Sequence, residues 1–139
     1  MTRDAAWLRR LAEVYFDEDL PVDIPLDDDD PRRPDEDRRG AVLVQIRRLA
    51  NKEPEECWRF VQIACELPLS EGQLGLLGAG ILEDLMNDHG SKFLDRVEAA
   101  ATGSASVQTV VDSTWTQSMD PYVARAFKTL QSHGGKRRG

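Results

Sequence analysis

The residues of this chain whose types and spacing could do chemistry together lie in one predicted helix. They are Glu83, Asp84, Asp88 and His89, and Asp84 and Asp88 share a helix face because they are four residues apart. Two carboxylates and an imidazole suffice in principle for a divalent metal or an acid–base pair. A metal site also takes ligands from a second element, however, and the chain has no HExxH, CxxC or GxSxG motif. We therefore predict no enzyme activity, no catalytic residue, no metal and no other cofactor.

The helix that must position these residues is predicted from Ser70 to His89. Its apolar side chains recur with the period of a single helical stripe, and they are Leu74, Leu77, Ile81, Leu82, Leu85 and Met86. Three glycines interrupt the stripe, at positions 75, 78 and 80, and each costs about 1 kcal/mol against alanine. A helix that keeps them is expected to let a neighbouring helix approach closely.

The end of this helix is predicted at Gly90, in the left-handed conformation that glycine readily adopts. The next helix would then run antiparallel to it and begin at Ser91. On that reading Lys92 and Arg96 would pair with Asp84 and Asp88 across the two helices. A functional acidic patch with His89 at its edge is the alternative.

The rest of the chain is read in the same way, from apolar periodicity and from proline and glycine punctuation. Further helices are predicted over 4–16, 35–50, 54–67, 91–102, 104–117 and 121–130. Residues predicted to be buried are Trp58, Leu77, Leu82, Leu85, Phe93, Val97 and Phe127, and the face of the second helix is assigned to Leu43, Ile46, Leu49 and Ala50. We predict one all-α domain over 1–139, with six to seven helices as stacked antiparallel pairs in a compact bundle or a short solenoid.

Charge is spread unevenly along the chain. The net charge is −7, but residues 17–37 hold eleven acids and two bases, so that this segment carries −9 and the rest +2. Its four prolines exclude a helix across most of it. We expect a loop, solvated and partly mobile, whose alternating apolar residues from Leu20 to Leu26 could pin its middle to the helices. The basic tail, 134–139, is expected to be disordered.

Several classes of function are disfavoured by composition. A nearly neutral body without clustered lysine and arginine disfavours nucleic-acid binding, and no apolar run is long enough to span a membrane. The first residues lack the apolar core of a secretory signal. Cys57 and Cys65 would lie about 12 Å apart on one helix, too far for a disulfide. We expect free thiols and a cytoplasmic protein.

The stretch from Gly78 to Ala101 resembles a bacterial family called domain of unknown function 6869. The matching pattern contains Leu82-Glu83-Asp84-Leu85, then His89-Gly90, then Phe93-Leu94, with Trp115 downstream. Residue 81 departs from it, since isoleucine stands where the family suggests proline, and the acidic segment is an insertion. The resemblance implies a small helical domain, with no activity to transfer.

The function predicted from these patterns is binding of another protein that has a basic surface. An acidic loop on a rigid body offers fast, steered association, as in an immunity- or antitoxin-like protein that blocks a basic toxin. The residues predicted to contact the partner are Asp23, Asp27, Asp28, Asp29, Asp30, Glu83, Asp84 and Asp88. The alternative is a scaffold subunit of a larger assembly, which would use an apolar contact instead.

Overall fold

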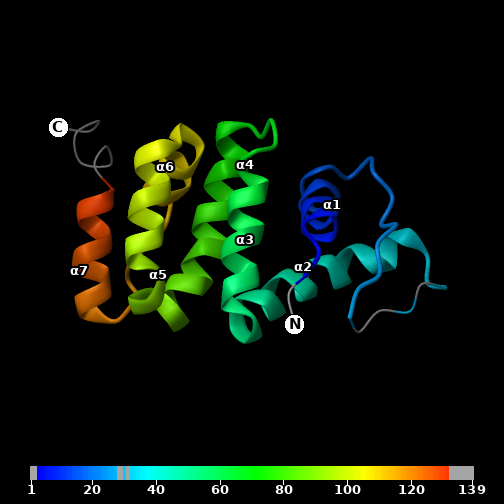
Figure 1. The fold of residues 1–139 in the computed structure, drawn as a ribbon. Coiled ribbons are helices and arrows are strands. Elements are labelled where there is room, and N and C mark those ends of the chain that lie inside the picture. Colours follow the sequence, from blue (N-terminus) through cyan, green and yellow to red (C-terminus); the bar gives the residue numbers. More distant parts are fainter. Residues whose placement is uncertain (1–2, 28–29, 31, 132–139) are drawn as a thin grey trace. The chain divides into compact units, whose positions relative to one another are not determined.

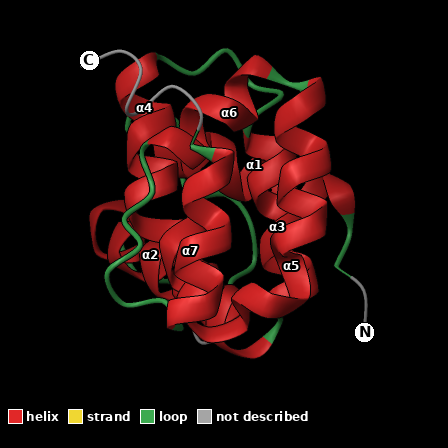
Figure 2. Ribbon diagram, turned by 90° about the vertical axis from the view of Figure 1, so that its left-hand side faces the viewer, coloured by secondary structure: helices red, strands yellow, loops and turns green. Residues whose placement is uncertain are grey.

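The computed structural model describes residues 3–27, 30 and 32–131. All regular structure in these ranges is helical, as predicted, and no strand occurs among them (Figure 2). The contacts group the chain into an N-terminal unit, residues 1–67, and a C-terminal unit, residues 68–139, which are described separately below. The predicted tail at 134–139 lies outside the described residues. None of the described helices is both long and apolar enough to cross a membrane.

The N-terminal unit consists of three helices that pack pairwise on one another (Figure 1). They are α1 (Ala5–Phe16), α2 (Asp35–Lys52) and α3 (Pro54–Ala64). Helix α1 begins where Asp4 accepts a hydrogen bond from the Ala6 amide at 2.7 Å. Helix α3 begins at Pro54, whose missing N–H costs nothing in a first turn.

The C-terminal unit is built on a helical run that changes its winding twice and is then interrupted by a kink at His89. The run comprises α4 (Glu71–Leu76), the π-helix η1 (Leu77–Leu82) and α5 (Glu83–Gly103). Ser70 and Gln73 form a capping box at its start. Two further helices pack on it, α6 (Ala105–Asp112) against all three parts and α7 (Pro121–Leu130) against α5. Caps at Ser104 and Asp120 start these helices.

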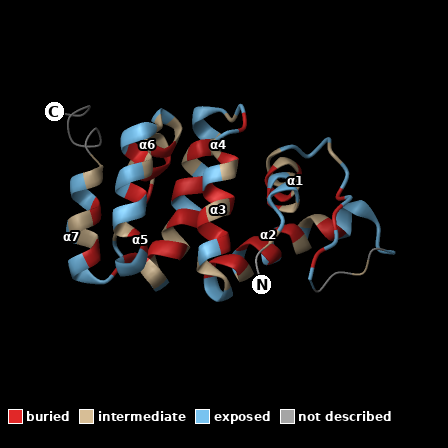
Figure 3. Cartoon of the chain, viewed as in Figure 1, coloured by how far each residue is buried: buried red, intermediate tan, exposed pale blue. Residues whose placement is uncertain are grey.

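The predicted core is confirmed. Every residue of the predicted stripe and of the core set lies in the buried class (Figure 3). The second helix differs at one position, because Leu43 is 36% exposed while Val42 faces the core in its place. Predicted helix ends also differ. Helix α2 ends at Lys52 rather than at residue 50, and α3 ends at Ala64 rather than at Leu67. Helix α6 ends at Asp112, which leaves Trp115 in a loop.

The predicted close approach of a neighbouring helix occurs at Gly78. A Cβ atom built there would lie 2.1 Å from the Val110 carbonyl oxygen and 3.1 Å from Thr114 Oγ1. No side chain fits in that space, so glycine lets α6 lie directly on the π-helix. At Gly80, by contrast, an added Cβ would meet nothing within 4 Å.

The first helical stretch ends close to the predicted position. Two helical stretches of α5 meet at a kink at His89, where φ is −136° and ψ is 19°, and the chain turns back there (Figure 1). The predicted left-handed conformation of Gly90 is wrong, because no glycine among the described residues has a positive φ. An added Cβ at Gly90 would lie 2.6 Å from Val123 Cγ1, so this glycine serves the packing of α7. Asp84 and Asp88 therefore lie before the kink, and Lys92 and Arg96 lie after it, as predicted.

Replacing Gly78 by alanine should destabilise the fold. The new methyl group would collide with backbone, and overpacking of this kind costs about 1–3 kcal/mol or more. Gly80→Ala is the matched control, and it should raise stability by up to about 1 kcal/mol because alanine is the better helix former. Chemical denaturation of both variants measures this difference. Equal effects of the two substitutions would contradict the close packing of α6 on η1.

Candidate functional site

The acidic segment, residues 17–37, is anchored to the helices of the N-terminal unit along its described part. Val22, Ile24 and Leu26 are buried, as their alternation predicted. The indole Nε1 of Trp7 donates to the Pro25 carbonyl oxygen at 2.8 Å. The middle of the segment is thus an extended strap over α1 and α2 rather than a solvated loop.

Two arginines at the start of α2 hold this strap by its backbone. Arg38 is buried, and its guanidinium donates to the carbonyl oxygens of Val22 and Ile24, the latter at 2.9 Å. Arg39 donates to the Val14 carbonyl oxygen at 2.8 Å and to that of Leu20. A guanidinium has five N–H donors and no acceptor, so carbonyl oxygens of a segment without its own ladder suit it well.

Asp23 and Asp27, two of the predicted partner-binding residues, form internal ion pairs. Asp23 receives two hydrogen bonds from Arg10, at 2.8 and 2.9 Å. Asp27 receives two from Arg3, at 2.9 and 2.6 Å, and one from Gln45 Nε2 at 3.1 Å. These carboxylates are thus directed at the chain's own helices.

The pKa values of these acids follow the pairing. Hydrogen bonds from Arg3 lower the pKa of Asp27 from 3.8 to about 2, against the opposing effect of partial burial. Arg10 lowers the pKa of Asp23 in the same way, and Arg32 that of Asp30, which it contacts at 3.0 Å. Asp28 and Asp29, the other predicted contacts in this segment, lie outside the described residues.

The acids at the beginning of the segment face solvent instead. Asp17, Glu18 and Asp19, which we call the acidic turn, are exposed, and none forms an ion pair within the described ranges. The turn is nevertheless ordered, because the Leu20 amide donates to the Asp17 carbonyl oxygen at 3.2 Å and the Asp19 amide to Asp17 Oδ1 at 3.0 Å. Sequence reasoning treated the segment as one charged loop and did not single out these three residues.

The second predicted cluster lies on α5, immediately after the π-helix. Asp88 is exposed, whereas Glu83, Asp84 and His89 are half-buried. His89 Nε2 and Asn87 Oδ1 are buried without a hydrogen-bond partner among the described atoms. Among all residues that the structure describes, no group of three His, Cys, Asp or Glu side chains has a geometry that could hold a metal ion.

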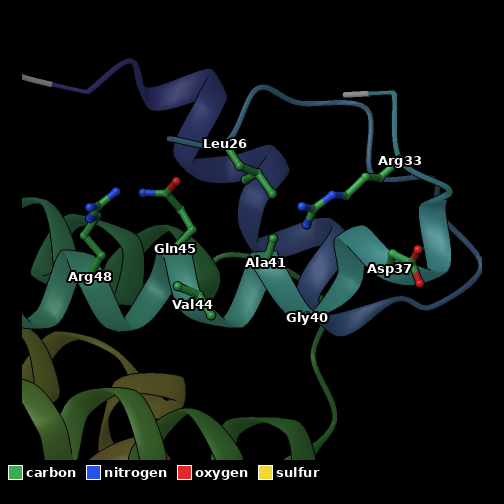
Figure 4. Close-up of a pocket in the computed structure, with 8 residues that line it drawn as sticks. All are labelled: Leu26, Arg33, Asp37, Gly40, Ala41, Val44, Gln45 and Arg48. Carbon is green, nitrogen blue, oxygen red and sulfur yellow. The ribbon is translucent and has the colours of Figure 1, made fainter. Parts of the chain in front are cut away.

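A groove that sequence reasoning missed lies between α2 and the acidic segment, whose Leu26 and Arg33 form its opposite wall (Figure 4). One hollow of about 280 Å³ includes Gly40, Val44 and Arg48 in its wall, and an adjoining one of about 270 Å³ shares the last two of these. Val44 is 63% exposed. The signal that could have found this groove is the run of small and apolar residues between acids at one end of α2 and bases at the other.

The two cysteines are free, as the helical spacing predicted. Cys57 is buried in α3, and Cys65 follows the end of that helix. Burial raises the pKa of the Cys65 thiol to about 12, with Glu66 adding to the effect. A thiol with so high a pKa is a poor nucleophile at neutral pH.

A family model described as a family of unknown function, DUF6869, matches residues 31–133. The chain belongs to this family, as its resemblance suggested, and the match extends beyond the stretch from Gly78 to Ala101 in both directions. It includes α2 and the cluster on α5, while the strap and the acidic turn precede it. Neither a curated protein nor a solved structure matches the chain.

The ion pair of Asp27 should make stability depend on pH in a defined window. Its lowered pKa means that its contribution is fully present above about pH 4 and is lost as pH falls toward 2. Asp27→Asn keeps the shape and removes the charge, so it should lower the free energy of unfolding at pH 7 by about 1 kcal/mol, as for a partly exposed pair.

The measurement is urea denaturation of wild type and variant between pH 7 and pH 2, and the two should converge at the acid end. Asp19→Asn is the control, because this exposed carboxylate has no ion pair among the described residues. The assigned ion pair would be contradicted if wild type and Asp27→Asn had the same free energy of unfolding at pH 7. It would also be contradicted if their difference at pH 7 persisted unchanged at pH 2.

Proposed function

We propose that this member of the DUF6869 family is a protein-binding module that occupies a basic surface of its partner, as an immunity- or antitoxin-like protein would. The observation that carries the proposal is the division of the acidic segment into two parts. Asp23, Asp27 and Asp30 face the chain's own arginines, whereas the acidic turn at 17–19 presents three exposed carboxylates that form no ion pair among the described residues, on an ordered backbone.

Internal pairing changes which acids suit a partner. A carboxylate already held by two arginine hydrogen bonds would have to exchange that pair for a new one, with little net gain. The acidic turn has no such pair to give up, and its backbone is already fixed, which reduces the entropy lost on binding. We therefore move the proposed contact from Asp23, Asp27 and Asp30 to the acidic turn.

The charge of the N-terminal unit supports a basic partner. Residues 1–67 contain 17 acids and 11 bases, whereas residues 68–139 contain 8 acids and 7 bases. A surface with this excess would attract a basic protein over roughly the Debye length, about 8 Å at physiological ionic strength. On the C-terminal unit only Asp88, among the predicted contacts there, is exposed, and it is a secondary candidate. We place this function in the cytoplasm, where the two free thiols would stay reduced.

A scaffold role is the second candidate, and a different observation favours it. In the C-terminal unit Leu76, Trp115 and Tyr122 are 62%, 61% and 75% exposed. Large exposed apolar and aromatic side chains are typical of protein contacts in which charge plays little part. The two functions therefore predict different sensitivity to salt.

The test is affinity capture from a lysate with the full chain, followed by binding kinetics with the captured protein. The informative variant is Asp17→Asn, Glu18→Gln and Asp19→Asn combined. The control combines Glu66→Gln, Asp95→Asn and Glu98→Gln, which change the net charge equally at exposed positions elsewhere.

We expect a partner with a basic surface, whose association rate falls about tenfold or more with the acidic-turn variant and falls steeply with added salt. Dissociation should change much less, and the control variant should bind as wild type. A partner whose association rate is the same with both variants would contradict the proposal, and a contact insensitive to salt would favour the scaffold role.

A further inference from the structure

The outward face of α2 is charged in opposite senses at its two ends. Acidic side chains stand near its beginning, bases stand near its end, and small or apolar residues lie between them. The residues concerned are Glu36 and Asp37, then Gly40 and Val44, then Arg47 and Arg48. All except Arg48 are exposed, and Arg48 is half-buried.

The spacing places each acid on the same flank of the helix as one base. Glu36 and Arg47 are eleven residues apart, as are Asp37 and Arg48. Eleven residues make about three full turns and a rise of about 16 Å. The face is therefore bordered on each flank by an acid and a base, and the groove of Figure 4 adjoins the flank of Asp37 and Arg48.

A face of this kind is complementary to itself. When two such helices lie antiparallel about a two-fold axis near residue 42, each flank meets the same flank of the other copy. Glu36 then meets Arg47 of the second copy and Asp37 meets Arg48, and the symmetry makes each pair twice. Val44 lies over Gly40, since these two positions are equally far from the axis.

We propose that two copies of this chain associate through α2 in this antiparallel arrangement. Gly40 leaves room for the approach, because a Cβ atom built there would meet nothing within 4 Å. The exposed Val44 supplies the apolar contact, and the two shallow hollows that share its side chain would accept side chains of the second copy.

The charges favour a second copy over an unrelated partner. Glu36 and Arg47 form no ion pair within the described part of the chain, whereas Arg48 also contacts Asp27, at 3.9 Å. One helix face gives a small interface with exposed ion pairs, so the dimer should be weak and weakened further by salt. This association does not involve the acidic turn and is independent of the proposed partner binding.

Charge reversal tests the arrangement directly. In Glu36→Arg, arginines would face Arg47 of the second copy, and in Arg47→Glu, glutamates would face Glu36. Each variant alone should lose self-association by about tenfold or more. An equimolar mixture should form a heterodimer about as readily as wild type forms its dimer, because every facing pair is then of opposite charge.

Sedimentation velocity over a range of concentrations measures each protein and the mixture at low and high salt. Gly40→Gln provides a variant that should keep the fold, since glutamine favours helix over glycine and no described atom lies within 4 Å of a Cβ atom at this position. It should remain monomeric. Wild type that is monomeric at every concentration, a dimer unaffected by Gly40→Gln, or single variants that are not rescued on mixing would overturn the proposal.

Discussion

The N-terminal unit depends on the burial of one charged side chain. Arg38 places its guanidinium under the strap, where the carbonyl oxygens of Val22 and Ile24 accept its hydrogen bonds. A buried arginine is costly unless its donors are satisfied. A proline-rich segment without strand partners has unpaired carbonyl oxygens to offer. Arg38 therefore satisfies the carbonyl oxygens of the strap, and these oxygens satisfy the buried guanidinium. The acidic segment thereby becomes part of the folded N-terminal unit.

Fixing the strap determines how its charges are used. Because the side chains of an extended segment alternate, the apolar residues from Val22 to Leu26 face the helices and Asp23 lies between them at the surface, beside Arg10. Asp27, at the end of the strap, meets Arg3 and Gln45. The acidic turn, before the strap begins, keeps exposed carboxylates that form no ion pair among the described residues. The division into internal and outward charge follows from this backbone path.

Local signals in the sequence predicted most of the helices, because caps and stripes depend on neighbouring residues. Asp4, Ser70, Ser104 and Asp120 each start the helix that was predicted to follow. The helix break near Gly90 was predicted, but its cause was not, because Gly90 has no positive φ and instead makes room for Val123 of α7. The burial of the Arg38 side chain could not be predicted either, because the carbonyl oxygens that accept its hydrogen bonds lie 14 and 16 residues away in the sequence. The acidic segment of the candidate site could be predicted from the sequence. Which of its acids pair with the chain's own arginines and which face solvent could not.

Amide hydrogen exchange at two positions of the strap tests this account most directly. The Val22 amide donates to Asp35 Oδ1 at 2.5 Å, and the Asp27 amide donates to Gln45 Oε1 at 2.7 Å. If the strap is part of the folded body, both amides should exchange far more slowly than in an unfolded chain, approaching the amides of α1. Exchange at unfolded-chain rates for both amides, while α1 and α2 stay protected, would contradict it.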